Sequence, residues 1–188
     1  EHRSLSFAVH PMVAAGYRAG VPHSLNAGYT VKRGENVFLE WSPTLHWYNA
    51  SLIRTVVVGA ATARALEFES IAREAIEAIC ETLRPGTPAC AVAEVGRNIL
   101  EPLRSEITFH EYYGYPTGIG FPPTWDERSG FNLVADNERE VADGMTFHIP
   151  INLRVHGQWG VGMSQTVVVT EGGAKALSQL PLAITVVD

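Results

Sequence analysis

The sequence contains only two cysteines, has no long apolar run and shows no excess of basic residues, and each shortage excludes a class of protein. Cys80 and Cys90 have no cysteine or histidine partner at a zinc-binding spacing. No apolar run reaches the roughly 18 residues of a membrane span, and no signal peptide is visible, so we expect a cytoplasmic protein. The net charge of −6 leaves no basic stripe for nucleic acid.

The remaining composition is that of one globular domain. A chain of 188 residues can bury a sizeable core, and the contents of 46% hydrophobic and 18% charged residues are ordinary for a globular protein. Because the chain opens on Glu1 rather than methionine, we expect a fragment or a processed product of something longer.

Hydrophobic periodicity predicts strands, then two helices, then strands. Short β-branched or aromatic segments indicate strands at 37–41, 52–58, 145–149, 165–169 and 183–187. The spacing of apolar residues predicts a helix over 68–83, ended by Arg84-Pro85-Gly86, and a second helix from Thr87-Pro88 to about Pro102. Residues 116–143 are rich in glycine and proline and are expected to form a long loop. This order predicts an α+β fold with the helices packed on one side of a sheet.

Seven short motifs, in order, resemble the creatinase and aminopeptidase P family, whose fold is called pita-bread. They are Val21-Pro22-His23, 34–40, 51–59, Arg84-Pro85-Gly86, 114–125, Gly144-Met145-Thr146-Phe147 and 164–173. The resemblance implies a pita-bread domain over 1–188, a curved antiparallel sheet with helices on one side. It also implies that the first helix of the fold and an amino-terminal domain lie upstream, and that the protein is a homodimer.

The resemblance implies a site without metal. Metal-dependent members use two Asp, one His and two Glu, which suit hard divalent cations. The corresponding positions here are Glu40, Ser51, Thr117, Pro150 (or Ile149) and Ser164. Since only one anionic ligand of five remains, we expect no metal and no other cofactor.

Two residues are predicted to be catalytic. Creatinase is a metal-free member that keeps a histidine at the position of His23 and uses it to move protons, a role that suits imidazole. Glu40 lies among apolar strand residues, where burial would make it a general base or a nucleophile. Alternatively, His23 is a loop histidine without a role, and Glu40 is an edge-strand glutamate that faces water.

Motifs around Glu40, 48–55, 114–127, 144–148 and 164–167 resemble most closely the ectoine hydrolase branch of the family, which hydrolyses a cyclic amidine. Substrate contacts are expected from Tyr48, Arg54, Thr117, Trp125, Glu127, His148 and Gln165. Trp125, Tyr48 and Trp159 could form an apolar or cation–π wall. Each aromatic residue could equally be core, His148 could be a satisfied core histidine, and Glu127 could close a turn.

The sequence thus predicts a metal-independent hydrolase that cleaves a non-peptide C–N bond in a small amidine-like or cyclic solute. Two alternatives remain open. One is an Xaa-Pro metallopeptidase of the aminopeptidase P or prolidase type. The other is a catalytically inactive binding protein built on the same scaffold.

Overall fold

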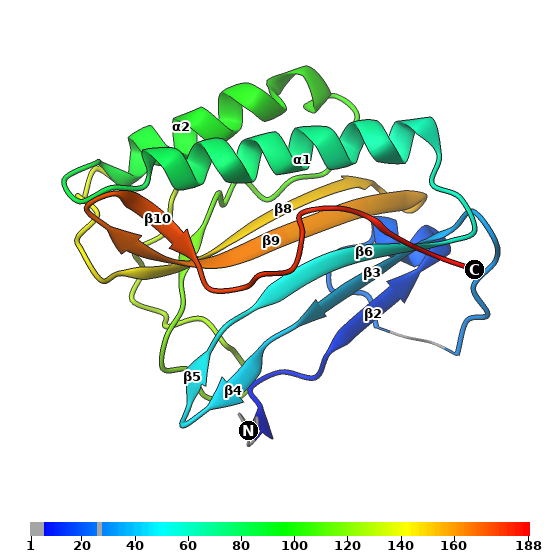
Figure 1. Cartoon of the computed structure of the whole chain (residues 1–188), viewed down its shortest axis with the longest axis horizontal. Coiled ribbons are helices and arrows are strands. Elements are labelled where there is room, and N and C mark those ends of the chain that lie inside the picture. The colour runs from blue at the N-terminus through cyan, green and yellow to red at the C-terminus, as the bar shows by residue number, and fades with distance from the viewer. Residues whose placement is uncertain (1–5, 26–27) are drawn as a thin grey trace.

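The structure is a computed structural model that describes residues 6–25 and 28–188. Two helices lie along one side of a pair of curved sheets (Figure 1). The strands are β1 (Ser6–Phe7), β2 (Met12–Ala15), β3 (Asn36–Trp41), β4 (Pro43–Leu45), β5 (Tyr48–Asn49), β6 (Leu52–Val58), β7 (Tyr115–Pro116), β8 (Thr146–Val155), β9 (Trp159–Thr170), β10 (Gly173–Ala176) and β11 (Thr185–Val187). The helices are α1 (Ala63–Thr82) and α2 (Ala89–Leu100), with short 3-10 turns at Gly16–Gly20 and Glu101–Leu103.

The two larger sheets have the orders β10-β9-β8-β7 and β11-β6-β3-β2, and a small third sheet has the order β1-β4-β5. All pairings are antiparallel except that of β11 with β6. Strand β6 lies beside β9, where Thr55 Oγ1 donates to the Gly162 carbonyl at 3.0 Å and accepts from the Gly162 N–H at 2.9 Å. The two larger sheets are therefore joined along these strands.

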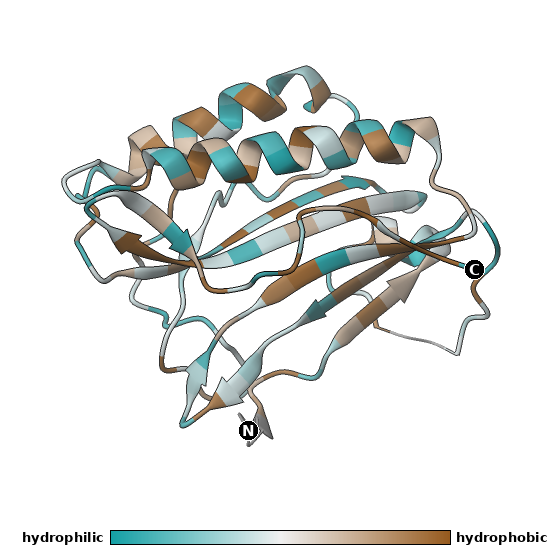
Figure 2. Ribbon diagram, in the orientation of Figure 1, coloured by the Kyte–Doolittle hydropathy of each residue, from teal (hydrophilic) through white to brown (hydrophobic). Residues whose placement is uncertain are grey.

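Helix α1 begins earlier than its apolar periodicity indicates. Thr62 is the N-cap, and its side chain accepts a hydrogen bond from the Ala65 N–H. Helix α2 begins directly after Pro88, and Pro102 lies in the 3-10 turn that follows it. Both helices alternate hydrophobic and hydrophilic positions along their length (Figure 2), and their apolar sides contribute to the main hydrophobic core. None of the described helices combines the length and the hydrophobicity that a bilayer crossing requires.

Strand β8 divides the molecule into a core side and a site side. Its odd-numbered residues, Phe147, Ile149, Ile151 and Leu153, are fully buried in the main hydrophobic core beneath the helices. Because side chains alternate along a strand, the even-numbered residues lie on the opposite, concave face. These residues are His148, Pro150, Asn152 and Arg154.

The long strand β8 passes through Pro150, where the sequence predicts that it ends. The Thr117 N–H binds the Thr146 carbonyl at 3.0 Å, and the Thr108 N–H binds the Arg154 carbonyl at 2.8 Å. Backbone groups of even-numbered residues therefore point away from β9. The missing N–H of Pro150 breaks no hydrogen bond of the β8–β9 ladder, so the strand can continue.

The remaining differences from the sequence prediction are small. Strand β9 is longer than 165–169, and the loop between the strands predicted at 37–41 and 52–58 contains the extra hairpin β4–β5. Strands β1, β2, β7 and β10 were not predicted, because they are short or weakly patterned. The pita-bread α+β architecture, with both helices on one side, is confirmed.

Candidate active site

A cavity of about 720 Å³ lies on the concave side of the sheets. It is lined by Val9, His10, Met12, Pro22, His23, Leu25, Glu40, Thr108, Phe109, His110, Tyr112, Tyr115, Pro123, Thr124, Trp125, Asp126, Pro150, Asn152 and Arg154. The cavity thus brings together the two predicted catalytic residues, His23 and Glu40, with the predicted substrate contact Trp125. A mostly apolar pocket with a few polar groups is the usual form of a small-molecule site.

Glu40 is the buried carboxylate of this cavity. It lies on β3 with only 6% of its surface exposed, on the face that also carries the buried Phe38. Burial raises the pKa of Glu40 to about 7, and the positive charge of Arg154 opposes part of that shift. A carboxyl group with this pKa exchanges a proton near neutral pH, as a general base must.

A chain of hydrogen bonds runs from the cavity wall into the core. The Trp125 indole N–H donates to the Tyr115 hydroxyl at 2.8 Å, and that hydroxyl lies 2.6 Å from His148 Nδ1. His148 Nε2 lies 2.6 Å from Ser164 Oγ, which also accepts the Ile53 backbone N–H at 2.7 Å. We call this chain the relay.

Burial favours one direction of the relay, because the reverse direction would leave the proton of the fully buried Ser164 hydroxyl without an acceptor among the described residues. The Ser164 hydroxyl already accepts from Ile53, and within the described residues its own proton has only His148 Nε2 as an acceptor. Burial lowers the pKa of His148 to about 3, so the ring is neutral and its proton lies on Nδ1. His148 then donates to the Tyr115 oxygen, which accepts from Trp125 as well.

The consequence is a free O–H on Tyr115. Its oxygen accepts two hydrogen bonds, so its own hydrogen is available to another acceptor. Burial raises the pKa of the Tyr115 hydroxyl, which keeps the group protonated. Ser51 Oγ lies close enough to influence that pKa but makes no hydrogen bond of good geometry. Since Tyr115 lines the cavity, it can donate to a bound molecule.

The residues at the family's ligand positions do not fit a divalent cation pair. Ser164 is engaged in the relay, Thr117 Oγ1 donates to the Asn49 carbonyl at 3.1 Å, and Pro150 offers no donor atom. Glu40 supplies the one carboxylate. Among the described residues no group of three or more His, Cys, Asp or Glu side chains is arranged to hold a metal ion. We therefore derive no chemical step through a metal.

His23 reaches the same cavity from a loop. It follows the 3-10 turn at Gly16–Gly20, adopts a positive φ of 52° and is exposed. Non-glycine residues in this region of φ are uncommon and occur often at functional sites. The position is compatible with exchanging protons between solvent and a molecule in the cavity.

Several predicted substrate contacts lie elsewhere. Tyr48 and Thr117 line a separate cavity of about 420 Å³. Gln165 is next to Ser164 on β9 and therefore faces the opposite side of the sheet, between Met163 and Val167 of the helix-side core. The Arg54 side chain donates to the carbonyls of Ile53, Ser164 and Leu180, which is a structural role.

Glu127 and Trp159, two further residues that were expected near the substrate, do not line the large cavity. Glu127 is exposed and does not line the large cavity, whereas Asp126 does and accepts a hydrogen bond from the Thr124 hydroxyl at 2.8 Å. Trp159 does not join the cavity wall. It packs on Phe68 beneath α1, with ring centroids 4.8 Å apart.

His148 combines the two roles that the sequence left open. It is fully buried and hydrogen-bonded on both ring nitrogens, as a satisfied core histidine would be. It does not line the cavity, but it orients Tyr115, which does. Its influence on a bound molecule is therefore indirect.

Among the cavity residues that the sequence analysis did not single out are Tyr115, Asn152 and Arg154. For the last two, the alternation of Ile151 and Leu153 with polar neighbours was a usable signal. That alternation alone is also typical of a strand with one face in water. Tyr115 stood inside a motif but carried no signal of its own.

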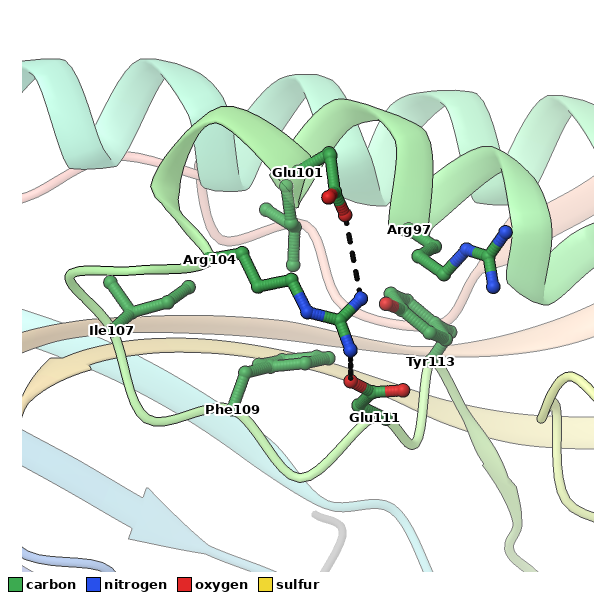
Figure 3. Close-up of a pocket in the computed structure, with 8 residues that line it drawn as sticks. Arg97, Glu101, Arg104, Ile107, Phe109, Glu111 and Tyr113 are labelled. Carbon is green, nitrogen blue, oxygen red and sulfur yellow. Dashed lines mark hydrogen bonds and ion pairs between the residues drawn. The ribbon is translucent and has the colours of Figure 1, made fainter.

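A smaller hollow beneath the end of α2 has different chemistry (Figure 3). It measures about 170 Å³, and its Arg104 is held by Glu101 at 3.4 Å and by Glu111 at 2.9 Å. The arginine is neutralised by these exposed carboxylates. We assign it no function.

Known proteins resemble the chain over nearly its whole length. It is 30% identical to ectoine hydrolase of Halomonas elongata over 177 residues, which cover 93% of this chain and 43% of that protein. It is 26% identical to an Xaa-Pro dipeptidase of Pyrococcus horikoshii over 175 residues, which cover 92% of this chain and 47% of the relative. The crystal structure of an X-Pro aminopeptidase from Thermotoga maritima superposes with a TM-score of 0.88 at 25% identity, covering 98% of this chain and 51% of the other.

The chain spans about half the length of the curated relatives it matches. The family model for metallopeptidase family M24 matches residues 1–171. Together with the pita-bread architecture and the cavity on its concave side, this match shows that the chain belongs to metallopeptidase family M24.

Proposed function

We propose that the protein is a metal-independent hydrolase that cleaves a C–N bond in a small amidine-like or cyclic solute. The observation that carries this proposal is the content of one cavity. Glu40, His23 and Tyr115 all line it, while Ser164, one of the positions that the resemblance assigns to metal ligands, is engaged in the relay. The similarity to ectoine hydrolase of Halomonas elongata supports the substrate class.

The reaction requires three events, and the cavity offers a group for each. The oxygen of a water molecule bonds to the amidine carbon while Glu40 takes up one of its protons, the C–N bond breaks, and the departing nitrogen takes up a proton, which yields an amide and an amine. Glu40 in its ionised form activates the nucleophile, because its pKa near 7 leaves a substantial fraction ionised at neutral pH. Tyr115 donates a hydrogen bond to the departing nitrogen, which has a lone pair once the amidine carbon is tetrahedral, and His23 exchanges protons with solvent.

The walls of the cavity suit a flat, cationic ring. Trp125 is 7% exposed and is fixed by its hydrogen bond to Tyr115, so it offers a rigid aromatic surface. Tyr112 and Phe109 also line the cavity. A protonated amidine could stack on such faces while its charge is balanced by Glu40.

A second candidate is an Xaa-Pro dipeptidase. The 26% identity to the Pyrococcus horikoshii enzyme favours it, because that relative carries this activity in its name. The donor set of the site opposes it, since Ser164, Thr117 and Pro150 stand at the ligand positions. Metal-dependent catalysis of this kind would therefore require a ligand set that the described residues do not form.

The test is a turnover assay of the intact protein with a cyclic amidine and with a prolyl dipeptide, each with and without chelator. We expect hydrolysis of the amidine that chelator leaves unchanged, and a loss of at least about a hundredfold in kcat for Glu40→Gln. Hydrolysis only of the dipeptide, abolished by chelator, would establish the second candidate. Saturable binding of the amidine without turnover, unchanged in Glu40→Gln, would instead identify a binding protein.

A further inference from the structure

Arg154 carries a buried positive charge that the protein itself does not pair. It is 5% exposed and lines the large cavity from the concave face of β8. Within the described residues its guanidinium makes no hydrogen bond, and its Nε is buried without a partner. Since a guanidinium has five N–H donors, burying it in this way is costly unless a further group completes it.

The protein holds this guanidinium in place by other means. The Arg154 side chain lies over the Phe38 ring, 4.6 Å from its centroid, in a cation–π contact. Its backbone carbonyl is fixed by the Thr108 N–H at 2.8 Å. The guanidinium is therefore positioned while its hydrogen-bond donors remain unused.

Glu40 does not account for Arg154 as a partner in an ion pair. The two charges influence each other's pKa, so they lie near each other along the cavity. Among the described residues, however, no ion pair or hydrogen bond joins them. If the two residues served as an internal salt bridge, their charged groups would be in direct contact, because a buried charge is stabilised by such contact.

Asn152 provides a second unsatisfied group on the same face. It lies two residues before Arg154 on β8, so both side chains point to the cavity side, and both line the cavity. Asn152 is 4% exposed, and its amide oxygen is buried without a hydrogen-bond partner. Within the described residues its amide nitrogen makes no hydrogen bond either. The Asn152 oxygen is an acceptor and cannot bind a carboxylate, but the amide N–H groups are donors. A cavity wall that presents an unused guanidinium and these unused N–H groups is suited to a carboxylate.

We propose that Arg154 and Asn152 form a carboxylate-binding subsite, so that the substrate is a small zwitterion that carries a carboxylate as well as its cationic group. In this arrangement the carboxylate meets Arg154 while the cationic end lies toward Glu40. The amidine half of this description rests on the proposed function. The carboxylate half rests on Arg154 and Asn152 alone.

The experiment measures binding, so that it does not depend on turnover. Intact protein is titrated calorimetrically with three probes: a tetrahydropyrimidine carboxylic acid, the same cyclic amidine ring without the carboxylate, and a prolyl dipeptide. Arg154→Met removes the charge and keeps a long side chain. Arg139→Met is the matched control, because Arg139 also lies over a phenylalanine ring, Phe131 at 4.5 Å, but does not line the cavity.

We expect the wild type to bind the ring acid more tightly than the bare ring. Arg154→Met should raise the Kd of the acid at least about tenfold and change that of the bare ring less than about threefold, whereas Arg139→Met should change neither. Arg154→Lys should recover only part of the loss, since the ammonium cannot form the bidentate contact. Thermal unfolding of each variant shows whether the fold is intact.

The outcomes separate the two proposals. Equal binding of the acid and the bare ring by wild type, or equal losses for both in Arg154→Met, overturns the subsite even if the amidine is hydrolysed. Tight, Arg154-dependent binding of the prolyl dipeptide, with no binding or hydrolysis of either ring, supports the carboxylate subsite and overturns the proposed amidine substrate. Failure of wild type to prefer any carboxylate probe over the bare ring also overturns the subsite.

Discussion

The raised pKa of Glu40 makes a prediction about stability as well as about catalysis. A carboxyl group whose pKa rises from 4.5 to about 7 on folding favours the folded state in its protonated form. The contribution is fully present below the unfolded pKa and is lost as the pH rises through the folded pKa. Because one pKa unit corresponds to about 1.4 kcal/mol, Glu40 should remove about 3 kcal/mol of stability between about pH 4.5 and pH 7.

Glu40→Gln tests this number, because glutamine keeps the shape and never ionises. The free energy of unfolding is measured by urea denaturation at about pH 5 and about pH 8 for wild type and variant. The change in the free energy of unfolding between the two pH values includes a contribution from every titrating group. The difference between this change in wild type and in the variant isolates the contribution of Glu40. We expect the variant to gain about 2–3 kcal/mol relative to wild type on going to the higher pH.

The control is Glu138→Gln, which removes a carboxylate from a solvent-exposed position. It should follow the wild type at both pH values. If the stability of Glu40→Gln runs parallel to that of wild type across this range, the carboxyl group is not held in a desolvated site. The assignment of Glu40 as a base tuned to neutral pH would then fail as well.

Three further perturbations test the relay and the cavity wall. Tyr115→Phe should lower kcat about 10- to 100-fold with the fold retained, because the free O–H is lost; an unchanged kcat would exclude Tyr115 as the donor. Ser164→Ala should lower the free energy of unfolding by about 1–3 kcal/mol, because the Ile53 N–H and His148 Nε2 lose their hydrogen-bond partner. Ser51→Ala is the control and should lower it less, because the Ser51 hydroxyl makes no good hydrogen bond. Gly162→Ala should also destabilise, by about 1–3 kcal/mol, and weaken the binding of carboxylates, because a Cβ there would strike the Phe38 ring that supports Arg154. Equal stability of Ser164→Ala and Ser51→Ala, or a Gly162→Ala protein as stable as wild type, would count against this packing.

Motifs in the sequence were sufficient for the fold and for part of the site. The two helices and the main strands follow from short patterns, and the structure places His23 and Glu40, which motifs also indicated, in one cavity. Gln165 shows where motif matching alone misleads: it adjoins Ser164, and neighbouring residues on a strand face opposite sides. That parity could have been applied to the sequence before the structure was known.

Other parts of the site depend on contacts between distant segments. Arg154 reads as a strand residue on a face exposed to water until the loop that carries Thr108 and the strand that carries Phe38 close around it. The relay joins residues from β6, β7, β8 and β9 and from the loop of Trp125. No local pattern contains information about such a set, because each hydrogen bond is defined only when the two sheets meet.

The relay has a consequence for how the site could change by mutation. It includes Ser164, which stands at one of the positions that the resemblance assigns to metal ligands, and Ser164 is hydrogen-bonded to both Ile53 and His148. Returning a single carboxylate, for example by Ser164→Glu, would both break the relay and introduce a buried charge without a counterion. A variant with this single change would therefore be less stable than the present protein. Conversion of this site into a metal centre would therefore require several residues to change together, because a single substitution lowers the stability of the protein.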